Sequence, residues 1–291
     1  MEVLANFLIR FVVIFIFSFG SSSYGQTNYT GKYITSNYFD KFIEFTKQEF
    51  DNFIANEIPQ GLSKIVTDKN NAGPTLSGLH RDVTGEGSHR RLSSSIRFKL
   101  QDKLESELTA HSCEVIIIER LPNGVFADPF ELHHLVERGV FTDPAVFGDT
   151  NLELPSFHSN QSVVEIHMSL ASKVSSRNED DVEINVELPL HARYPPLGHV
   201  FSRVEFGQPD LLICCGFDRN VVNKSCLFML VDQTVVNKDN DVIWDIPCGN
   251  KEHAGAVYTV TFGFAIVAVM LIVLTSICYS GSQGSDHLKR S

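Results

Sequence analysis

The chain has 291 residues, of which 43% are apolar and 20% charged, and its formal net charge is −11. This apolar fraction predicts that most of the chain folds, and the length allows one or two domains. The negative charge excludes a general nucleic-acid binder as the function class, since the basic run His89–Arg91 is too short to outweigh it.

The first 25 residues are expected to be a secretory signal peptide that is removed from the fold. Arg10 precedes the apolar run FVVIFIFSFG, which is too short for a membrane span, and the small residues Ser23 and Gly25 suit signal peptidase. Glu2 offsets the charge of Arg10, so an uncleaved anchor is the alternative. In either case the domain that follows is expected in the secretory lumen.

The next two segments are predicted to be a helix and a loop. Residues 38–54 place Phe39, Phe42, Ile43, Phe50, Phe53 and Ile54 near helical spacing with charged residues between them, which predicts one amphipathic helix. Residues 67–95 are rich in Gly, Ser, Asn and Asp, a composition typical of a loop or linker.

From residue 113 onward the pattern indicates short strands. Residues 114–121 form a β-branched run that is expected to be buried on both faces, and residues 162–170 and 181–190 alternate between apolar and polar side chains. Further short apolar runs cover 199–206, 211–217 and 226–231. The predicted fold is mainly β: a luminal antiparallel β-sandwich-like domain with an N-terminal helix, plus one C-terminal transmembrane helix.

Residues 121–139, LPNGVFADPFELHHLVERG, crowd acidic and histidine side chains into a short stretch. Glu131 and His134 have the i, i+3 spacing of helical metal ligands, but a second such pair is missing from the sequence. Asn123-Gly124 is a turn signal with access to positive φ, and Asp128 is expected to cap a helix that Pro129 begins. We therefore interpret these residues as architectural.

A second apolar segment, residues 254–279, predicts a transmembrane helix. Its dense part, Val257–Tyr279, contains no charged residue and spans about 34 Å as a helix, enough to cross a hydrocarbon core of about 30 Å. A GPI-attachment signal is the alternative, but such a tail usually ends the chain, and here residues 280–291 follow it. With Lys289 and Arg290 in a cytosolic tail, the topology is type I and residues 26–253 are luminal.

An oxidising lumen permits disulfides among the five cysteines outside the predicted span, and because five is odd at least one stays free or pairs elsewhere. The adjacent pair, Cys214 and Cys215, would point to opposite faces of a strand and is not expected to pair with itself. Three N-glycosylation sequons also fit the luminal assignment. The disulfide candidates are Cys113, Cys214, Cys215, Cys226 and Cys248, and the glycosylation candidates are Asn28, Asn160 and Asn223.

Sequence templates for catalysis are missing. There is no G-x-S-x-G, Walker A, H-E-x-x-H or G-x-G-x-x-G motif, and no C-x₂-C spacing for zinc. We therefore expect no catalytic residues, cofactor or metal. A luminal domain without such motifs is more often a binding or assembly module than an enzyme.

Five stretches follow one another in order: GLHRDV at 78–83, LPNGVFADPFEL at 121–132, LPLHARYPP at 188–196, QPDLLICC at 208–215 and WDIPCGN at 244–250. Together they resemble the PIG-X family, the accessory subunit of GPI mannosyltransferase I, over residues 78–279. The main one is LPNGVFADPFEL at 121–132, which carries Phe126 and Phe130 where relatives can carry Tyr. The N-terminal helix has no counterpart in the resemblance.

The resemblance implies a non-catalytic subunit in the endoplasmic reticulum membrane that binds and stabilises PIG-M, the mannosyltransferase that adds the first mannose of the GPI anchor. Asp128, Pro129, His191 and Arg193 are the candidate partner-binding residues. His191 and Arg193 continue the polar face of the 182–190 strand, so we expect them to point outward; a salt link inside the domain is the alternative for Arg193. The alternative function is a cell-surface type I glycoprotein that binds an extracellular ligand.

Overall fold

The computed structural model describes residues 33–57, 75–99, 112–170, 181–198, 201–216, 225–229 and 242–288. The predicted signal peptide, the sequons at Asn28 and Asn223, and the charged end of the tail at Lys289 and Arg290 lie outside these residues.

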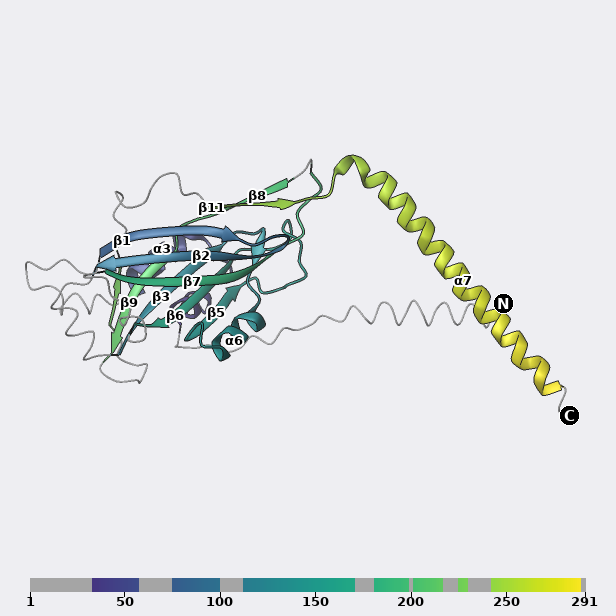
Figure 1. Ribbon diagram of the computed structural model, residues 1–291, viewed down its shortest axis with the longest axis horizontal. Coiled ribbons are helices and arrows are strands. Elements are labelled where there is room, and N and C mark those ends of the chain that lie inside the picture. The colour runs from purple at the N-terminus through teal and green to yellow at the C-terminus, as the bar shows by residue number, and fades with distance from the viewer. Residues whose placement is uncertain are drawn as a thin grey trace, which may run out of the picture.

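Two antiparallel sheets form the body of the domain, and the first lies across the second (Figure 1). The first sheet has the order β1-β2-β7-β4 and the second β10-β9-β3-β6-β5, with a separate two-stranded ribbon β11-β8. The strands of the first sheet are β1 (Thr75–Thr84), β2 (His89–Lys99), β4 (Val125–Phe126) and β7 (Asp181–Ala192). The strands of the second are β3 (Ser112–Leu121), β5 (Asp143–Gly148), β6 (Ser162–Ser169), β9 (Asp210–Gly216) and β10 (Ser225–Phe228); those of the ribbon are β8 (Phe201–Phe206) and β11 (Val242–Pro247). The predicted mainly β, antiparallel sandwich is confirmed.

The main core lies between the two sheets and is supplied by alternate residues of each strand. In β7 the inward set runs from Val182 to Leu190, as the alternation predicted, and Val115 and Ile117 of β3 meet it from the second sheet. The ribbon closes the same core with Trp244, the single tryptophan of the chain. Burial of this apolar surface is the dominant favourable term in folding the domain.

A third layer of two short helices covers the outer face of the second sheet, and these are α2 (Ile34–Phe39) and α3 (Lys47–Glu57). The prediction of one helix over 38–54 is wrong, because the chain turns between them. The Tyr38 hydroxyl holds this turn: it donates to the Glu44 carbonyl and accepts from Thr46 N at 3.1 Å each. As a result Ile43, expected in the apolar face, is 97% exposed.

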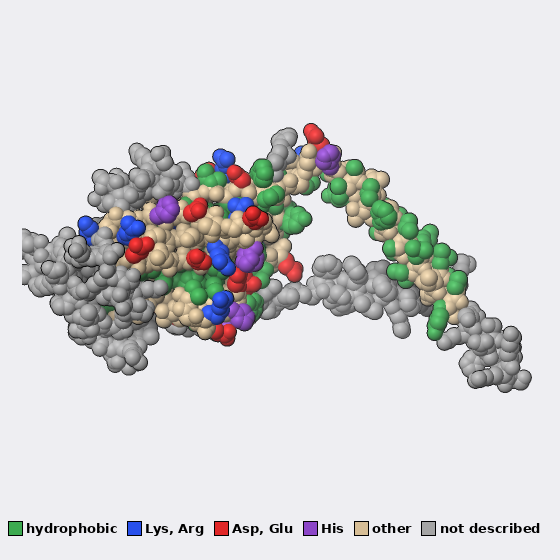
Figure 2. All heavy atoms as spheres, in the orientation of Figure 1, with side chains coloured by type: hydrophobic (Ala, Val, Ile, Leu, Met, Phe, Trp, Pro, Cys, Tyr) green, Lys and Arg blue, Asp and Glu red, His purple; other side chains and the backbone are tan. Residues whose placement is uncertain are grey.

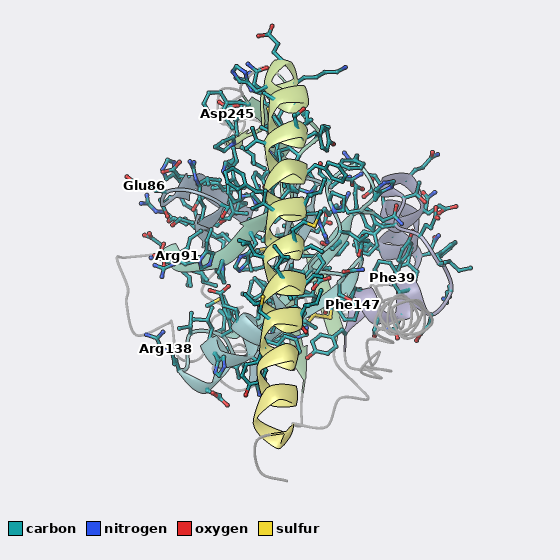
Figure 3. The ribbon with its side chains drawn as sticks, turned by 90° about the vertical axis from the view of Figure 1, so that its right-hand side faces the viewer. Phe39, Glu86, Arg91, Arg138, Phe147 and Asp245 are labelled. Atoms are coloured by element: carbon teal, nitrogen blue, oxygen red, sulfur yellow. A yellow bond between two sulfur atoms is a disulfide. The ribbon has the colours of Figure 1, made fainter. Side chains whose placement is uncertain are left out.

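Aromatic rings fill the space between the helical layer and the second sheet. Tyr38, Phe50 and Phe53 pack on Ile116 and Ile118 of β3, which confirms that this strand is buried on both faces. Phe39 stacks against Phe147 of β5 with ring centroids 6.3 Å apart, and the two rings lie side by side in Figure 3. The N-terminal helices are therefore part of the folded domain.

Residues 75–95 form most of a β-hairpin, so the predicted loop over 67–95 is wrong for its described part. β1 pairs with β2 in antiparallel register, and the tip contains Gly85 and Gly87 with φ of +102° and +73°. Serines lower the hydropathy of β2, but its alternate residues Leu92, Ile96 and Phe98 are fully buried. Glycine at the tip and serine in the strand produced the misleading loop composition.

The chain leaves the domain through β11, a short 3₁₀ helix η3 (Lys251–His253) and the long helix α7 (Ala254–Leu288) (Figure 1). α7 starts at the residue predicted for the span and continues past its predicted end at 279. The segment 251–279 is long and apolar enough to cross a membrane, and none of its apolar stretch is buried inside the protein. It is the candidate membrane span of the described chain.

Cys113, Cys214 and Cys226 are disulfide-bonded in the described part of the chain. Cys214 on β9 is bonded to Cys226 on β10, with their Cα atoms 4.0 Å apart. Cys113 is also disulfide-bonded, and Cys215 lies opposite it in the β3–β9 ladder. Cys248 is free, which removes it from the disulfide candidates and supplies the unpaired cysteine that an odd number requires.

Candidate functional site at the motif junction

The turn at residues 122–124 joins β3 to β4 and packs under the ribbon. Val125 N donates to the Pro122 carbonyl at 3.1 Å, so the predicted turn is present. Gly124 is not among the described glycines with positive φ. It is required for a different reason: a Cβ at this position would lie 2.5 Å from Val204 Cγ2. Close packing, rather than backbone conformation, selects glycine here.

The next residues begin helix α6 (Pro129–Glu137) as the sequence predicts. The Asp128 side chain accepts a hydrogen bond from Phe130 N at 2.8 Å, and Pro129 occupies the first turn. Leu132 is buried and fastens the helix to the domain. Asp128 and Pro129 are therefore a helix cap, and the cap directs Phe130 outward, where the residue is 69% exposed.

Glu131 of α6 reaches the ends of two strands. One of its carboxylate oxygens lies 3.0 Å from His191 Nε2 at the end of β7, and the other lies 3.2 Å from His89 Nε2 at the start of β2. Strand register brings the two histidines together, because His89 and His191 are directly opposite in the β2–β7 ladder. The carboxylate thus clamps α6 to both strands.

The two imidazole rings begin a stacked column that we define as His89, His191, Phe126 and Arg193. His89 and His191 stack with centroids 4.3 Å apart at an interplanar angle of 7°. Phe126 stacks on His191 at 5.1 Å, and the Arg193 guanidinium carbon lies 4.9 Å from the Phe126 centroid. The column joins residues from LPNGVFADPFEL and LPLHARYPP.

Arg193 is buried with an exposed fraction of 2%, so the expected outward orientation of its side chain is wrong. Its guanidinium donates to the carbonyls of Asn151 at 2.6 Å, Leu154 at 3.1 Å and Asp149 at 3.2 Å. Burial lowers the pKa of Arg193, and the nearby Asp149 opposes this shift. Strand alternation failed because a loop 39 to 44 residues away in sequence folds over the end of β7. His191 is half-buried under α6 and is also not a freely exposed side chain.

His89, Glu131 and His191 also form a set of ligand atoms within 4.8 Å of one another. The lone pairs of imidazole nitrogens lie in the ring planes, and these two planes are almost parallel, so they do not converge on one point. A single carboxylate facing two ring nitrogens satisfies the same atoms without an ion. The geometry therefore favours a hydrogen-bonded clamp over a metal site.

A second polar cluster connects two more of the motifs, GLHRDV and QPDLLICC, through adjacent residues of β3. Arg81, from GLHRDV, donates to both carboxylate oxygens of Glu119 at 2.8 and 2.7 Å and to the Gly207 carbonyl. Burial raises the pKa of Glu119, and Arg81 acts against this shift. Arg120 points to the other face of the sheet, where it contacts Asp210 and, at 2.7 Å, Asp51 of α3. Burial likewise raises the pKa of Asp210 while Arg120 lowers it.

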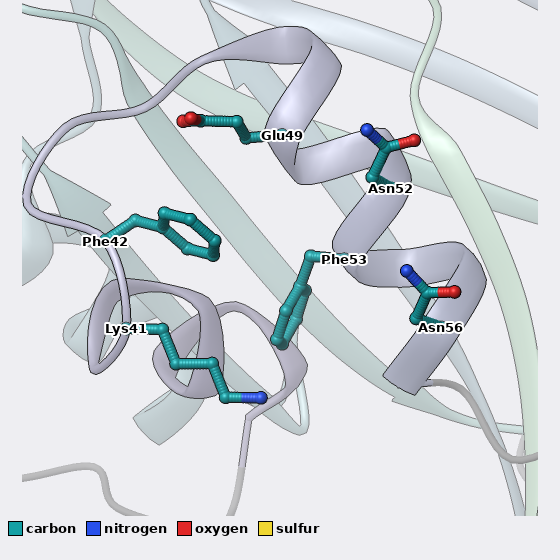
Figure 4. Close-up of a pocket in the computed structure, with 6 residues that line it drawn as sticks. All are labelled: Lys41, Phe42, Glu49, Asn52, Phe53 and Asn56. Atoms are coloured by element: carbon teal, nitrogen blue, oxygen red, sulfur yellow. The ribbon is translucent and has the colours of Figure 1, made fainter.

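A hollow of about 290 Å³ lies between α2 and α3 (Figure 4). Lys41 and Phe42 line one side, and Asn52, Phe53 and Asn56 extend from α3 on the other. The ammonium group of Lys41 lies 5.2 Å from the centre of the Phe53 ring. The lysine therefore already makes a cation–π contact inside the hollow. The stacked column together with Glu131, which we call the motif junction, brings more motif residues together and is the stronger candidate site.

These features define a class of protein. It is an antiparallel β-sandwich that carries a capped helix at the ends of two strands, and the sandwich leads through a short turn into a candidate membrane span. The chain belongs to the PIG-X / PBN1 family, whose model matches residues 77–277. The match includes both sheets, the motif junction and most of α7, and it begins after the two N-terminal helices. The resemblance read from the five motifs is therefore confirmed.

Three relatives carry the same name, GPI alpha-1,4-mannosyltransferase I, stabilizing subunit. The human protein is 26% identical over 218 residues, which cover 69% of this chain and 80% of the relative. The rat protein is 25% identical over 219 residues, covering 69% of this chain and 82% of the relative. The mouse protein is also 25% identical over 219 residues and is covered to 81%.

Sequence reasoning missed two members of the junction, His89 and Phe126. His89 stands in a short basic run inside the predicted loop, and the only sequence signal at Phe126 is that relatives can carry Tyr there. The strand alternation of β2, which places Leu92, Ile96 and Phe98 on one face, is the signal that could have placed His89 at a strand end. Its partner, 102 residues away, is visible only in the folded sheet.

Proposed function

We propose that this chain is the non-catalytic, stabilising subunit of GPI mannosyltransferase I in the endoplasmic reticulum membrane. In this role it binds a PIG-M-like catalytic subunit and supports addition of the first mannose during GPI-anchor biosynthesis. A partner that binds only the folded enzyme stabilises that enzyme by mass action. The observation that carries the proposal is family membership across both the sandwich and α7, together with the shared name of the human, rat and mouse relatives.

The proposed topology is type I and single-pass. A signal peptide at 1–25 is removed, residues 26–253 lie in the lumen, 254–279 span the membrane and 280–291 form the cytosolic tail. Asn160 is exposed on the domain surface, which is compatible with its use as a glycosylation site. As an endoplasmic reticulum resident, the protein should carry only glycans that endoglycosidase H removes. A cell-surface ectodomain, the alternative, would carry resistant, mature glycans.

The outward face of α6 is the surface that we assign to the catalytic subunit. It presents Phe130, with His133, His134 and Glu137 exposed beside it. Asp128 and Pro129 fix the start of this helix, and His191 holds it through Glu131. These three candidate residues would act by positioning Phe130, whereas the buried Arg193 would act by fixing the neighbouring loop.

A co-purification experiment tests this assignment. Cells that lack the chain are complemented with wild type, Phe130→Asp or Ile43→Asp, and the tagged catalytic subunit is purified from their membranes. We expect Phe130→Asp to lower both the recovered pair and the cellular amount of the catalytic subunit several-fold. Ile43→Asp is the matched control, since Ile43 is 97% exposed and lies outside the residues that the family model matches.

Two results would contradict the proposal at different levels. Wild-type recovery with a correctly folded Phe130→Asp protein would reject the α6 surface alone. Normal amounts of GPI-linked proteins and of the mannosyltransferase in cells without the chain would reject the function itself.

A further inference from the structure

Four large apolar side chains are exposed near the start of the membrane helix, three of them on loops and one at the first residue of β8. Tyr194 is 84% exposed, Phe157 and Phe201 are each 60% exposed, and Leu197 is 50% exposed. We call these four residues the apolar rim. Figure 2 shows hydrophobic side chains on the end of the domain nearest α7. Grouped aromatic and aliphatic exposure of this kind marks a contact surface rather than random composition.

Backbone hydrogen bonds join the rim to residues 249–251, the segment just before the apolar part of α7, which we call the root of the span. Gly198 N donates to the Gly249 carbonyl at 3.0 Å, and Lys251 N donates to the Gly198 carbonyl at 3.2 Å. Phe201 pairs with Pro247 in the ribbon. Leu197 lies directly on the root, because a Cβ added to Gly249 would be 2.8 Å from Leu197 Cδ2.

The other two rim residues, Phe157 and Tyr194, lie on neighbouring segments that are hydrogen-bonded to each other. Ser156 N donates to the Tyr194 carbonyl at 2.9 Å, which places Phe157 beside the segment that carries Tyr194 and Leu197. The polar helix η3, with Lys251, Glu252 and His253 all exposed, lies between these loops and the apolar part of α7. An order of apolar rim, charged turn and apolar helix suits the boundary between membrane and water.

The short stretch of chain between the rim and the apolar part of α7 limits the distance from the rim to the hydrocarbon core of the membrane. The residues from Asn250 to Val257 span about 10 Å if helical, and headgroups add roughly 5–8 Å on each side of the hydrocarbon core. Aromatic side chains, with tyrosine prominent among them, are favoured at this depth because an apolar ring and a polar edge are both satisfied there. The rim is therefore within reach of the interfacial layer.

We propose that the apolar rim inserts into the headgroup layer of the same bilayer that α7 crosses, so that the domain rests on the lipid surface. The occupant of the rim is lipid, because the backbone bonds of Gly198 to residues 249 and 251 and the pairing of Phe201 with Pro247 hold this side of the rim at the level where the span begins. Tyr194 directly follows the buried Arg193, so this contact also holds the motif junction at a set height above the membrane. The inference goes beyond the proposed function and does not depend on the catalytic subunit.

Tryptophan quenching in the purified full-length chain tests the proposal. The protein is reconstituted in phosphatidylcholine nanodiscs with acyl chains brominated near the headgroup, and Leu197→Trp is compared with Thr75→Trp. Thr75 pairs with Lys99, which pairs with Asp181, and Asp181 is eleven strand residues before Ala192, or about 36 Å away. The native Trp244 is buried and is the only tryptophan, so the wild-type protein supplies the background to subtract.

We expect brominated lipid to quench the emission added by Leu197→Trp, because a ring in the interfacial layer contacts the bromine atoms near the headgroup, and to leave that added by Thr75→Trp unchanged. Aqueous iodide should show the opposite preference. Phe201→Trp gives a second reading should the Leu197 variant fail to fold. Iodide quenching of both rim variants, with no effect of brominated lipid, would overturn the proposal. Protection from iodide that appears only when the catalytic subunit is added would overturn it too, by making the rim a protein interface.

Discussion

Glu119 and Arg120 are adjacent in β3, and each is partnered in a different layer of the domain. Glu119 faces the core between the sheets and meets Arg81, while Arg120 faces the helical layer and meets Asp210 and Asp51. The period of two along a strand explains the division. The motif residues Arg81 and Asp210 thus hold the layers of the domain together rather than face solvent. This structural role explains why they occur in the family motifs.

Replacing Arg81 by alanine should destabilise the domain strongly. The change leaves the Glu119 carboxylate buried without its cation, and breaking a buried pair in this way costs about 3–5 kcal/mol in the free energy of unfolding. Urea denaturation of the purified protein measures the loss. The double variant Arg81→Met, Glu119→Leu should recover most of it, because no unpaired charge remains.

The exposed pair Arg97–Glu183 on the first sheet is the matched control. Arg97→Ala should leave the unfolding midpoint unchanged, since solvent screens both charges. An Arg81→Ala protein as stable as the Arg97→Ala protein would show that Arg81 and Glu119 contribute no net stability.

At the scale of elements, the N-terminal helices are fastened to the sandwich by a buried polar cluster. Glu165 of β6 accepts hydrogen bonds from Ile34 N at 3.0 Å and Thr35 N at 2.7 Å at the start of α2. His167 lies between Glu165 at 2.8 Å and Glu114 at 3.4 Å. The alternation of residues 162–170 assigned Glu165 and His167 to the opposite face correctly, but that face is covered by helix rather than by water.

This cluster predicts that attachment of α2 depends on pH. Burial lowers the pKa of His167, but hydrogen bonds and charge from Glu114 and Glu165 outweigh it and raise the pKa from 6.5 to about 9. A raised histidine pKa means that its stabilisation is complete below pH about 6.5 and is lost as the pH rises through about 9. Amide exchange in residues 34–39 should therefore accelerate between these values.

His167→Gln is the control for this titration. The variant should lose the pH dependence of exchange in α2 while strands of the first sheet keep their wild-type exchange. A wild-type protein whose α2 exchanges with no more than the ordinary base-catalysed dependence on pH would contradict the role of His167.

Over the whole molecule, the folded domain and the membrane helix are separate in their packing. The core residues of the sandwich end at Ile246, and residues 255–279 of α7 are exposed. The domain therefore owes little of its stability to the helix, whereas its position at the membrane depends on it.

A chain that ends after His253 should fold as a soluble domain. Its thermal unfolding should remain cooperative, because the described apolar core is intact without α7. Circular dichroism of the secreted domain measures this, with the full-length protein in detergent for comparison. Loss of cooperative unfolding in the truncated chain would show that α7 packs on the domain.

Local chemistry in the sequence was sufficient for several elements. Asp128 and Pro129 predicted the start of α6, an uncharged apolar run predicted α7, and two-residue alternation predicted the faces of β7. The break between α2 and α3 also had a local signal, because Thr46 and Glu49 have the spacing of a capping box and their side chains bond to each other. The helical spacing of the phenylalanines on both sides of the break predicted one continuous helix instead.

What the sequence determined by itself was the sandwich class, the apolar helix, the cap of α6 and membership of the family, because each rests on neighbouring residues or on ordered motifs. Only the tertiary structure decided that Arg193 is buried, that His89 and His191 stack over Glu131, and that Glu165 and His167 lie beneath a helix. These outcomes depend on which distant segment covers a given strand end. Spacing along one strand records which side chains share a face, but another part of the chain decides whether that face meets water.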